Sequence, residues 1–381
     1  MRIGMITGEY PPMEGGVGDF TRQLSLALRD RDHGIHVLTS ELAAVPKGRS
    51  VEDGLMVHRK ITNWGWGSLR QIEHWASELN CDIVNLQYQA AAYGMKGWIN
   101  LLPGQLSSSA PPLVVTYHDL LPPYLFPKAG PLRQWTVWYL ARQADGAIAT
   151  NRQDYQALSQ ALGDQATPIR EIPIGSNIAA CPPSNYDRRS WREQHGFSTV
   201  DIVIGYFGLV NRSKGIETLL QSLAALIRRG YPVHLLMIGG SPGTSDTTNV
   251  GYAAEIQALI RQLGLEARVH RTGFLPPPEV SAAFYAVDVC ALPYRDGASL
   301  RRGTLHAALQ HGRAIVSTVP ALPIPEFEDG RNILFVPPDD PKALSEAILT
   351  LALDHSARDR LGARATELAK RFSWATIAAQ T

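Results

Sequence analysis

The stretch Ile3-Gly4-Met5-Ile6-Thr7, followed by Gly15-Gly16-Val17-Gly18 and then by residues 20–31, decides the fold class. The first segment is a short apolar run typical of a buried strand, and the glycines after it predict a turn. Residues 20–31 repeat apolar side chains at helical spacing, and Ile35–Thr39 is a second apolar run. A strand, a helix and another continuous apolar strand predict a parallel sheet that is covered on both faces.

The same alternation continues through both halves of the chain. A turn-rich stretch around residues 175–200, which includes Cys181-Pro182-Pro183, interrupts it. We therefore predict an α/β protein with two Rossmann-like, doubly wound domains at residues 1–180 and 181–360, followed by a helical segment at residues 361–381. Ligands bind outside the carboxyl ends of parallel strands, so the sequence predicts a small-molecule site in a cleft between the two domains.

Composition argues against several classes of protein. The 381 residues carry 36 Lys and Arg and 35 Asp and Glu, a net charge of +1, which disfavours nucleic acid as a partner. The three cysteines, Cys81, Cys181 and Cys290, are too far apart for a CxxC metal or redox motif. The sequence has no signal-peptide pattern and no apolar run of about 18 residues, so we expect a cytoplasmic protein whose membrane contact, if any, is peripheral.

Two segments of the first half follow predicted strands and could bind a ligand. Gly15 and Gly16 precede the first helix, where small residues let a ligand approach the backbone and free N–H groups attract an anion. Thr21 stands where a dinucleotide-binding pattern needs its third glycine, so a nicotinamide cofactor is disfavoured, and a plain glycine turn is the other alternative. His118 follows the strand at residues 113–116; it suits a hydrogen bond to a sugar hydroxyl or proton transfer, unless it is a partly buried, satisfied side chain.

Two segments of the second half occupy corresponding places. Arg212 and Lys214 lie between its first strand and first helix, where two cations beside a helix N-terminus suit a diphosphate. A second polar loop, at residues 296–304, also leads into a helix. The loop residues that we expect to contact the ligand are Asp296, Ser299, Leu300, Arg301, Gly303 and Thr304. A solvated basic turn and an ordinary capped helix are the alternative interpretations.

The sequence predicts no metal site. Asp30-Arg31-Asp32 has the spacing of an acidic metal-binding motif, but it ends a predicted helix and not a strand, so we interpret it as solvated. Asp339-Asp340 precedes Pro341 and is typical of a turn and a helix cap.

Taken together, these segments resemble the retaining GT-B glycosyltransferases of family 4 along essentially the whole chain. The motifs that carry the resemblance are Tyr10-Pro11-Pro12 with Gly15–Gly18, Thr116–Asp119, Pro173–Asn177, Phe207–Gly215, Gly239-Gly240, Gly273-Phe274 and Phe372-Ser373-Trp374. Each motif alone is moderately specific, whereas their order and spacing are much more so.

The resemblance implies a nucleoside-diphosphate-sugar donor held mainly by the second domain and an acceptor bound by the first. It implies transfer with retention and without a metal, in which Arg and Lys neutralise the leaving diphosphate. Lys214 occupies the family's Lys position, but the family's Arg position falls on Leu209, so Arg212 is expected to substitute. His118 would contact the transferred sugar.

Other residues are assigned by the same resemblance. Gly239 and Phe274 end strands that hold the nucleotide in the family. Phe372–Trp374 begins a closing helix that crosses back to the first domain, and the chain ends soon after it, at Thr381, so we expect a short tail or a truncated sequence. The family's two glutamates of an E-x7-E segment, one of which binds the ribose, fall on Ser299 and Ala307. His306 and Asp296 are the candidates to replace the ribose contact.

The acceptor is left open as a glycan, a lipid-linked molecule or a small molecule. Residues 120–126 are apolar, and Trp135 and Trp138 follow. This predicts either core or interdomain packing, the interpretation that we favour, or a patch for peripheral membrane contact. Two further functions remain as alternatives. One is a catalytically impaired nucleotide-sugar-binding scaffold, suggested by the missing glutamates, and the other is a GT-B sugar phosphorylase or sugar-phosphate synthase.

Overall fold

The structure, a computed structural model, describes all residues except 14, 44, 46, 125–128, 164–166 and 240–246, and of residues 247–250 it describes the backbone alone. Gly240, Leu125 and Phe126 of the motifs above therefore lie outside the described residues. The chain forms two compact units. The first comprises Met1–Asn177 and Ser373–Thr381, and the second comprises Ile178–Phe372.

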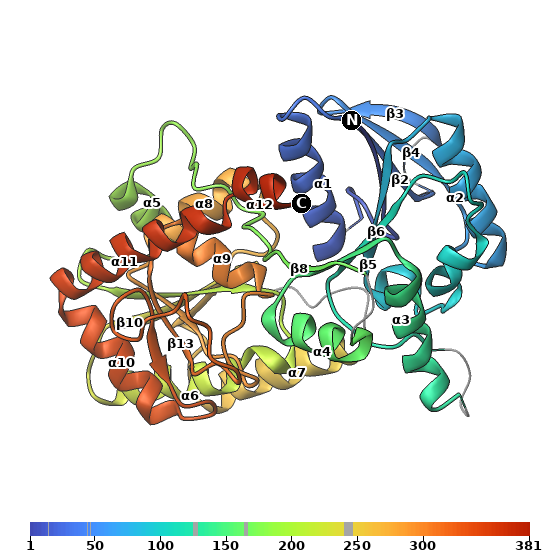
Figure 1. The fold of residues 1–381 in the computed structure, drawn as a ribbon. Helices are drawn as coiled ribbons and strands as arrows, with labels where there is room; N and C mark the ends of the chain where they lie inside the picture. The colour runs from blue at the N-terminus through green and yellow to red at the C-terminus, as the bar shows by residue number, and fades with distance from the viewer. Residues whose placement is uncertain (14, 44, 46, 125–128, 164–166, 240–246) are drawn as a thin grey trace. The chain divides into compact units, whose positions relative to one another are not determined.

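The first unit is built on an eight-stranded sheet in the order β3-β4-β2-β1-β5-β6-β7-β8 (Figure 1). Its strands are β1 (Arg2–Ile6), β2 (Gly34–Ser40), β3 (Gly48–Glu52), β4 (Leu55–Ile61), β5 (Ile83–Tyr88), β6 (Leu113–Tyr117), β7 (Gly146–Ala149) and β8 (Ile169–Glu171). All neighbours pair in parallel except β3, which forms an antiparallel hairpin with β4 at the sheet edge. The helical elements are α1 (Gly16–Arg29), α2 (Trp66–Glu78), η1 (Ala90–Tyr93), η2 (Trp98–Gln105), α3 (Pro131–Gln143), α4 (Arg152–Leu162) and α12 (Trp374–Gln380).

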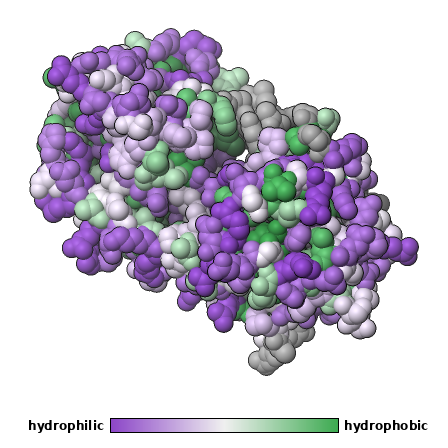
Figure 2. Space-filling model, turned by 90° about the horizontal axis from the view of Figure 1, so that it is seen from above, coloured by the Kyte–Doolittle hydropathy of each residue, from purple (hydrophilic) through white to green (hydrophobic). Residues whose placement is uncertain are grey.

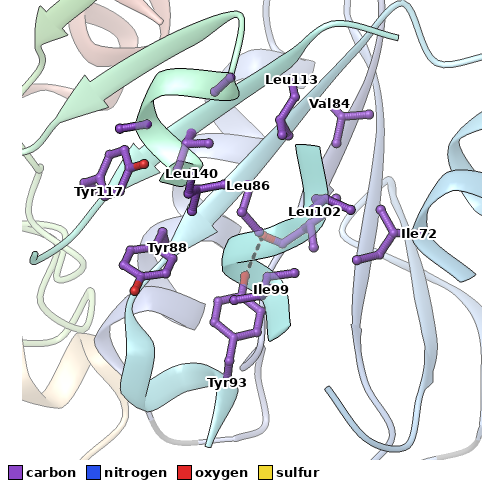
Figure 3. Close-up of a cluster of buried hydrophobic side chains, with 14 of the residues drawn as sticks. Ile72, Val84, Leu86, Tyr88, Tyr93, Ile99, Leu102, Leu113, Tyr117 and Leu140 are labelled. Atoms are coloured by element: carbon purple, nitrogen blue, oxygen red, sulfur yellow. Dashed lines mark hydrogen bonds between the residues drawn. The ribbon is translucent and has the colours of Figure 1, made fainter. Parts of the chain in front are cut away.

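Both faces of this sheet are covered because successive apolar residues of each strand point to opposite sides. Met5 packs with α1 and α12 on one face, while the next residue, Ile6, packs with α2, η2, α3 and α4 on the other. Figure 3 shows part of the second cluster, in which Leu86 and Tyr88 of β5 lie beside Leu140 of α3. The continuous apolar runs of the sequence are thus explained by burial on two faces.

The second unit repeats the architecture with a six-stranded parallel sheet in the order β11-β10-β9-β12-β13-β14. Its strands are β9 (Ile202–Gly208), β10 (Val233–Gly239), β11 (Val269–Arg271), β12 (Val289–Leu292), β13 (Ala314–Thr318) and β14 (Leu334–Val336). Its helical elements are α5 (Arg188–Gln194), η3 (Arg212–Lys214), α6 (Ile216–Arg228), α7 (Thr247–Gln262), α8 (Pro277–Ala286), α9 (Gly303–Gln310), α10 (Pro341–Leu353), α11 (His355–Ala369) and η4 (Lys370–Phe372). The predicted α/β class with two Rossmann-like sheets is confirmed.

The predicted C-terminal segment, residues 361–381, is divided between the two units. The end of α11 packs in the second unit, where Ala365 and Leu368 are buried. The last helix, α12, belongs to the first unit: the indole Nε1 of Trp374 donates to the backbone oxygen of Ser176 at 2.7 Å, and Ile377 is fully buried against α1. The chain therefore returns to its first unit only after residue 372.

Candidate functional site

The turn between β9 and α6 holds Lys214 in a fixed place. Lys214 ends η3, and Gly215 follows with φ 65° as the N-cap of α6. A β-carbon at Gly215 would lie 1.9 Å from the backbone oxygen of Pro293, so only glycine allows this turn to touch the loop after β12. Two loops at the carboxyl ends of neighbouring strands are thereby held together.

Lys214 is a buried cation with sparse hydrogen bonding. Its Nζ donates to Thr304 Oγ1 at 3.4 Å and lies 5.1 Å from the centre of the Tyr294 ring. Burial, reinforced by the charge of Arg302, lowers the pKa of Lys214 to about 7, against a smaller opposing effect of Asp296. Among the described residues, no carboxylate contacts this ammonium group, which is unusual for a buried charge, and an anionic ligand would satisfy it.

Arg302 is the second cation of this cluster. It is the N-cap residue of α9, and its guanidinium lies 4.9 Å from the centre of the same Tyr294 ring. Its Nη1 donates to Ser213 Oγ at 3.3 Å, and its Nη2 donates to both carboxylate oxygens of Asp296. Lys214 and Arg302 therefore converge on one aromatic ring from two loops, beside the free backbone N–H groups of a helix N-terminus.

The loop at residues 296–304 brings several predicted residues to this cluster. Thr304 Oγ1 lies 2.6 Å from the Tyr294 hydroxyl, and Gly303 is the first residue of α9. Arg301 donates to Asp296 at 3.2 Å, and its backbone N–H donates to Ser299 Oγ at 3.4 Å. Leu300 is buried, and its backbone oxygen contacts His306 Nε2 at 2.7 Å. Gly208 lies opposite Thr304. A β-carbon at position 208 would come within 2.8 Å of the Thr304 methyl group, so the close approach of the two residues requires glycine there.

Arg212 faces a different partner. Its Nη2 donates to both carboxylate oxygens of Glu255 of α7, at 2.6 and 2.7 Å, and its guanidinium lies 4.9 Å from the centre of the Tyr252 ring. The side chain is 60% exposed. The structure thus brings Lys214 together with Arg302, which the sequence had not singled out, and places Arg212 on the side of α7.

Gly239 and Phe274 lie on neighbouring strand ends. Gly239 ends β10 with φ 82°, and its N–H donates to Thr272 Oγ1 at 3.0 Å. It forms an isolated bridge with Gly273, the residue before Phe274. The Phe274 ring is 80% exposed, so it is free to pack on a flat ligand.

In the first unit, His118 is held as a neutral hydrogen-bonding group. Its Nε2 lies 2.9 Å from Gln87 Oε1, and the Phe20 ring packs edge-on at 4.7 Å. Burial lowers the pKa of His118 to about 3, so the imidazole is uncharged at neutral pH. A neutral ring suits a hydrogen bond to a sugar hydroxyl better than it suits general acid catalysis.

The N-terminus of α1, where Gly15 and Gly16 lie, already holds a carboxylate. Glu9 Oε1 accepts hydrogen bonds from the backbone N–H groups of Val17 at 3.0 Å and Gly18 at 3.2 Å. A β-carbon at Gly15 would lie 2.1 Å from that oxygen, whereas one at Gly16 would meet nothing within 4 Å. Burial raises the pKa of Glu9. A donor phosphate at Gly15 and Gly16 would have to displace this side chain.

A separate hollow of about 460 Å³ lies on β2, β4 and α2 of the first unit. Its polar lining includes Glu41, Lys47, Lys60 and His74. None of the predicted site residues lines it.

Comparison with known proteins decides the family. The family described as "Glycosyltransferase Family 4" matches residues 14–179, and "Glycosyl transferases group 1" matches residues 201–354, so the two matches together span most of the chain. The chain belongs to the family 4 glycosyltransferases. The predicted family is confirmed.

Three similar proteins illustrate the match. D-inositol 3-phosphate glycosyltransferase of Corynebacterium glutamicum is 29% identical over 63% of this chain and 57% of its own length. Phosphatidyl-myo-inositol mannosyltransferase of Mycolicibacterium smegmatis is 24% identical over 100% of this chain and 92% of its own length. The crystal structure of HepE of Anabaena in complex with UDP and glucose has a TM-score of 0.74 and 22% identity over 100% of this chain and 98% of that one. The chain spans little more than half the length of the first of these relatives, and the structural match supports the GT-B fold.

The structure bears on the two places where the resemblance implied a departure from the family pattern. Leu209 stands at the family's Arg position and is 51% exposed, while Arg302 brings a guanidinium to Lys214 from another loop. His306 is not accessible as a replacement for the ribose-binding glutamate, because it is buried, its Nε2 contacts Leu300 and Phe372 packs on its ring at 4.9 Å. Burial lowers the pKa of His306 to about 4, so it supports the 296–304 loop as a neutral side chain.

Neither a metal site nor a membrane span is found in the part of the chain that the structure describes. No cluster of three or more His, Cys, Asp or Glu side chains there could hold a metal ion. No helix among the described residues is both long and apolar enough to cross a bilayer. Transfer without a metal remains a prediction.

Proposed function

We propose that the protein transfers a sugar from a nucleoside-diphosphate-sugar to an acceptor, and that Lys214 and Arg302 bind the donor's diphosphate. The observation that carries the proposal is the convergence of these two cations on Tyr294 at the N-terminus of α9. Positive side chains and free N–H groups aimed at one point stabilise the negative charge that develops on a leaving diphosphate. Family membership supports the same assignment.

The proposal extends to the donor and to the course of the reaction. HepE was crystallised with UDP and glucose, which supports a uridine nucleotide as the first donor to test. We propose retention of configuration and independence of divalent metal, with Lys214 and Arg302 supplying the charge that a metal ion would otherwise supply. His118, neutral and bonded to Gln87, would hold a hydroxyl of the transferred sugar.

We propose a phosphorylated polyol or its lipid-linked form as the acceptor. Two relatives, by their names, act on D-inositol 3-phosphate and on phosphatidyl-myo-inositol. D-inositol 3-phosphate is a phosphorylated cyclitol, and phosphatidyl-myo-inositol carries the same type of group as its lipid headgroup. A shared inositol phosphate therefore supports this acceptor class.

A panel of UDP-, GDP-, ADP- and dTDP-sugars tests the proposed function. Binding is measured by calorimetry, and sugar release and transfer to inositol phosphates by product analysis, all in the presence of a chelator. Selective binding of one nucleotide with slow sugar release supports a metal-independent transferase. Binding without release or transfer to any acceptor would favour the scaffold alternative, and absence of binding across the panel would contradict the proposal.

The pH dependence of donor binding follows from the state of Lys214. Burial lowers the pKa of Lys214 to about 7 in the free protein, and a bound diphosphate would raise it, so protonation and binding favour each other. Affinity for UDP-glucose is therefore expected to be highest below pH 7 and to fall by up to about tenfold per pH unit above it. UDP-glucose is the probe because its diphosphate keeps the same charge across this range.

The control for this experiment is Lys214→Arg, since arginine stays charged at every pH used. This variant should bind with a flat pH profile. A wild-type profile that is flat, or that rises with pH, would rule out titration of Lys214 as the cause.

An exposed apolar patch on the first unit supports contact with lipid. Its members lie just before and at the start of η2, in the loop after β6, and near the starts of α2 and α3: Trp66, Met95, Trp98, Leu121, Tyr124, Leu132 and Trp135. Two pairs of its members lie in contact: the ring centroids of Trp66 and Trp98 are 5.7 Å apart, and the Tyr124 N–H donates to the Met95 oxygen at 2.8 Å. Arg133 packs on the Tyr124 ring at 4.7 Å. Figure 2 shows, on one face of the molecule, how apolar groups interrupt an otherwise hydrophilic surface.

The structure corrects the expectation of core packing for part of this segment. Trp135 is 46% exposed, whereas Trp138 packs against the buried core as expected. Exposed Trp and Tyr with nearby cations such as Lys96 and Arg70 are typical of proteins that rest on anionic membranes. We therefore propose that the patch docks on the surface that carries a lipid-linked acceptor.

Vesicle sedimentation measures this contact. The wild-type chain is expected to bind phosphatidylglycerol vesicles more strongly than phosphatidylcholine vesicles, and Trp66→Ala with Trp98→Ala should weaken binding by about tenfold or more. The control replaces Val200 and Leu353, which are apolar and even more exposed than the two tryptophans but lie on the second unit. Equal losses in both double variants, or no vesicle binding by the wild type, would refute the lipid contact.

A further inference from the structure

Asp296 occupies the place where an anion would meet Arg302. Both oxygens of its carboxylate accept from Arg302 Nη2, and one also accepts from Arg301 Nη2 at 3.2 Å. The Arg302 side chain is only 13% exposed, whereas that of Asp296 is 41% exposed. The cation is therefore fixed in the protein and its counterion lies at the solvent edge, as an exchangeable ligand would.

The backbone beneath Asp296 is held firmly. Gly297 has φ 83°, and a β-carbon there would lie 2.5 Å from the backbone oxygen of Val319. The N–H of Gly297 donates to the Tyr294 oxygen at 3.3 Å, and that of Ala298 donates to the Thr318 oxygen at 3.1 Å. A change of partner at Arg302 can thus occur by rotation of the Asp296 side chain without movement of the loop.

Arg302 also keeps contacts that do not depend on Asp296. Its Nη1 reaches Ser213 Oγ, its guanidinium packs on Tyr294, and its Nε is buried. These contacts fix the direction of the guanidinium even when the carboxylate leaves. Asp296 is therefore not required to orient the cation.

We propose that the Asp296 carboxylate is an internal stand-in for the donor's diphosphate. It neutralises Arg302 while the site is empty and rotates away when the diphosphate binds. This inference rests on the proposed function, because it assumes that the cluster of Lys214 and Arg302 binds a diphosphate. Its consequence is that Asp296 weakens nucleotide binding, both by competing for Arg302 and by repelling the incoming negative charge.

Calorimetric titration of the full chain with UDP tests the inference. Asp296→Asn keeps the size of the side chain and removes its charge, and it is expected to bind UDP about threefold to tenfold more tightly than the wild type. Uridine, which has no phosphate, should bind the two proteins equally. Unchanged or weaker UDP binding by Asp296→Asn would overturn the inference and assign Asp296 a positioning role.

Two controls separate this effect from a general change of charge. Glu255→Gln alters the net charge by the same amount and frees Arg212 from its own ion pair, so its UDP affinity should stay within about twofold of the wild type. In an Arg302→Ala background, Asp296→Asn should tighten UDP binding by less than it does in the wild type, because only the charge repulsion remains to be removed. An equal gain from Glu255→Gln, or a gain from Asp296→Asn that is undiminished without Arg302, would contradict the stand-in.

The outcome also distinguishes the inference from the function on which it rests. If the wild type binds UDP but Asp296→Asn does not bind it more tightly, the proposed diphosphate site is supported and the stand-in role of Asp296 is refuted. If neither protein binds any nucleotide of the panel, both are refuted.

Discussion

Replacing Lys214 by alanine is expected to lower the turnover of a nucleotide-sugar by about a hundredfold or more. The side chain is buried beside Thr304 and Tyr294, where a charge is poorly screened and acts strongly on a neighbouring anion. Removal of one preorganised group that stabilises transition-state charge typically costs factors of this size. Initial rates of sugar release and transfer at saturating donor measure the effect on kcat.

The matched control is Lys342→Ala, which removes an exposed lysine from α10 of the same unit. It should leave kcat and KM near their wild-type values. Near-wild-type turnover by a folded Lys214→Ala protein would show that Lys214 does not stabilise the leaving diphosphate.

Arg302→Ala is expected to lower kcat/KM by about thirtyfold or more, whereas Arg212→Ala should change it by less than about threefold. Arg302 shares the Tyr294 ring with Lys214, but Arg212 is engaged with Glu255 at the surface of α7. Arg302→Lys should recover only part of the loss, because an ammonium group cannot reproduce the forked donor geometry. Steady-state kinetics on the three variants, with folding checked by circular dichroism, provide the comparison.

The opposite ranking of the two arginines would be informative. A large loss in Arg212→Ala with little effect of Arg302→Ala would restore the assignment made from sequence spacing. It would mean that the Glu255 pair breaks when the donor binds.

The fold was largely predictable because burial on both faces leaves continuous apolar runs in the sequence. The strands that carried no such signal were missed. The edge strand β3, Gly48–Glu52, has one large apolar residue among charged and small ones and pairs on one side only, and β8, Ile169–Glu171, has three residues. The helix α5, Arg188–Gln194, lies inside the turn-rich stretch and is mostly charged, so its capping residue Asp187 was its only clear signal.

The candidate site was predictable in outline but not in its choice of cations. Spacing from Gly215 identified Lys214, because a glycine next to the cation sits at a strand-to-helix turn. Spacing also favoured Arg212, two residues away, over Arg302, which reaches the same ring from a loop far along the chain. Arg212 and Lys214 lie on the same short helix, η3, and sequence alone does not tell which of the two side chains points toward Tyr294. The ion pair with Glu255 holds Arg212 away from that ring.

The return of the chain to its first unit has a practical consequence for dissecting the molecule. Residues 178–372 are one uninterrupted segment, so the gene fragment for the second unit can be cut out cleanly. The first unit has no such fragment, because Trp374 and Ile377, which follow the whole second unit in the sequence, pack on its core. Cloning the first unit alone would need residues 373–381 rejoined to Asn177 through a linker.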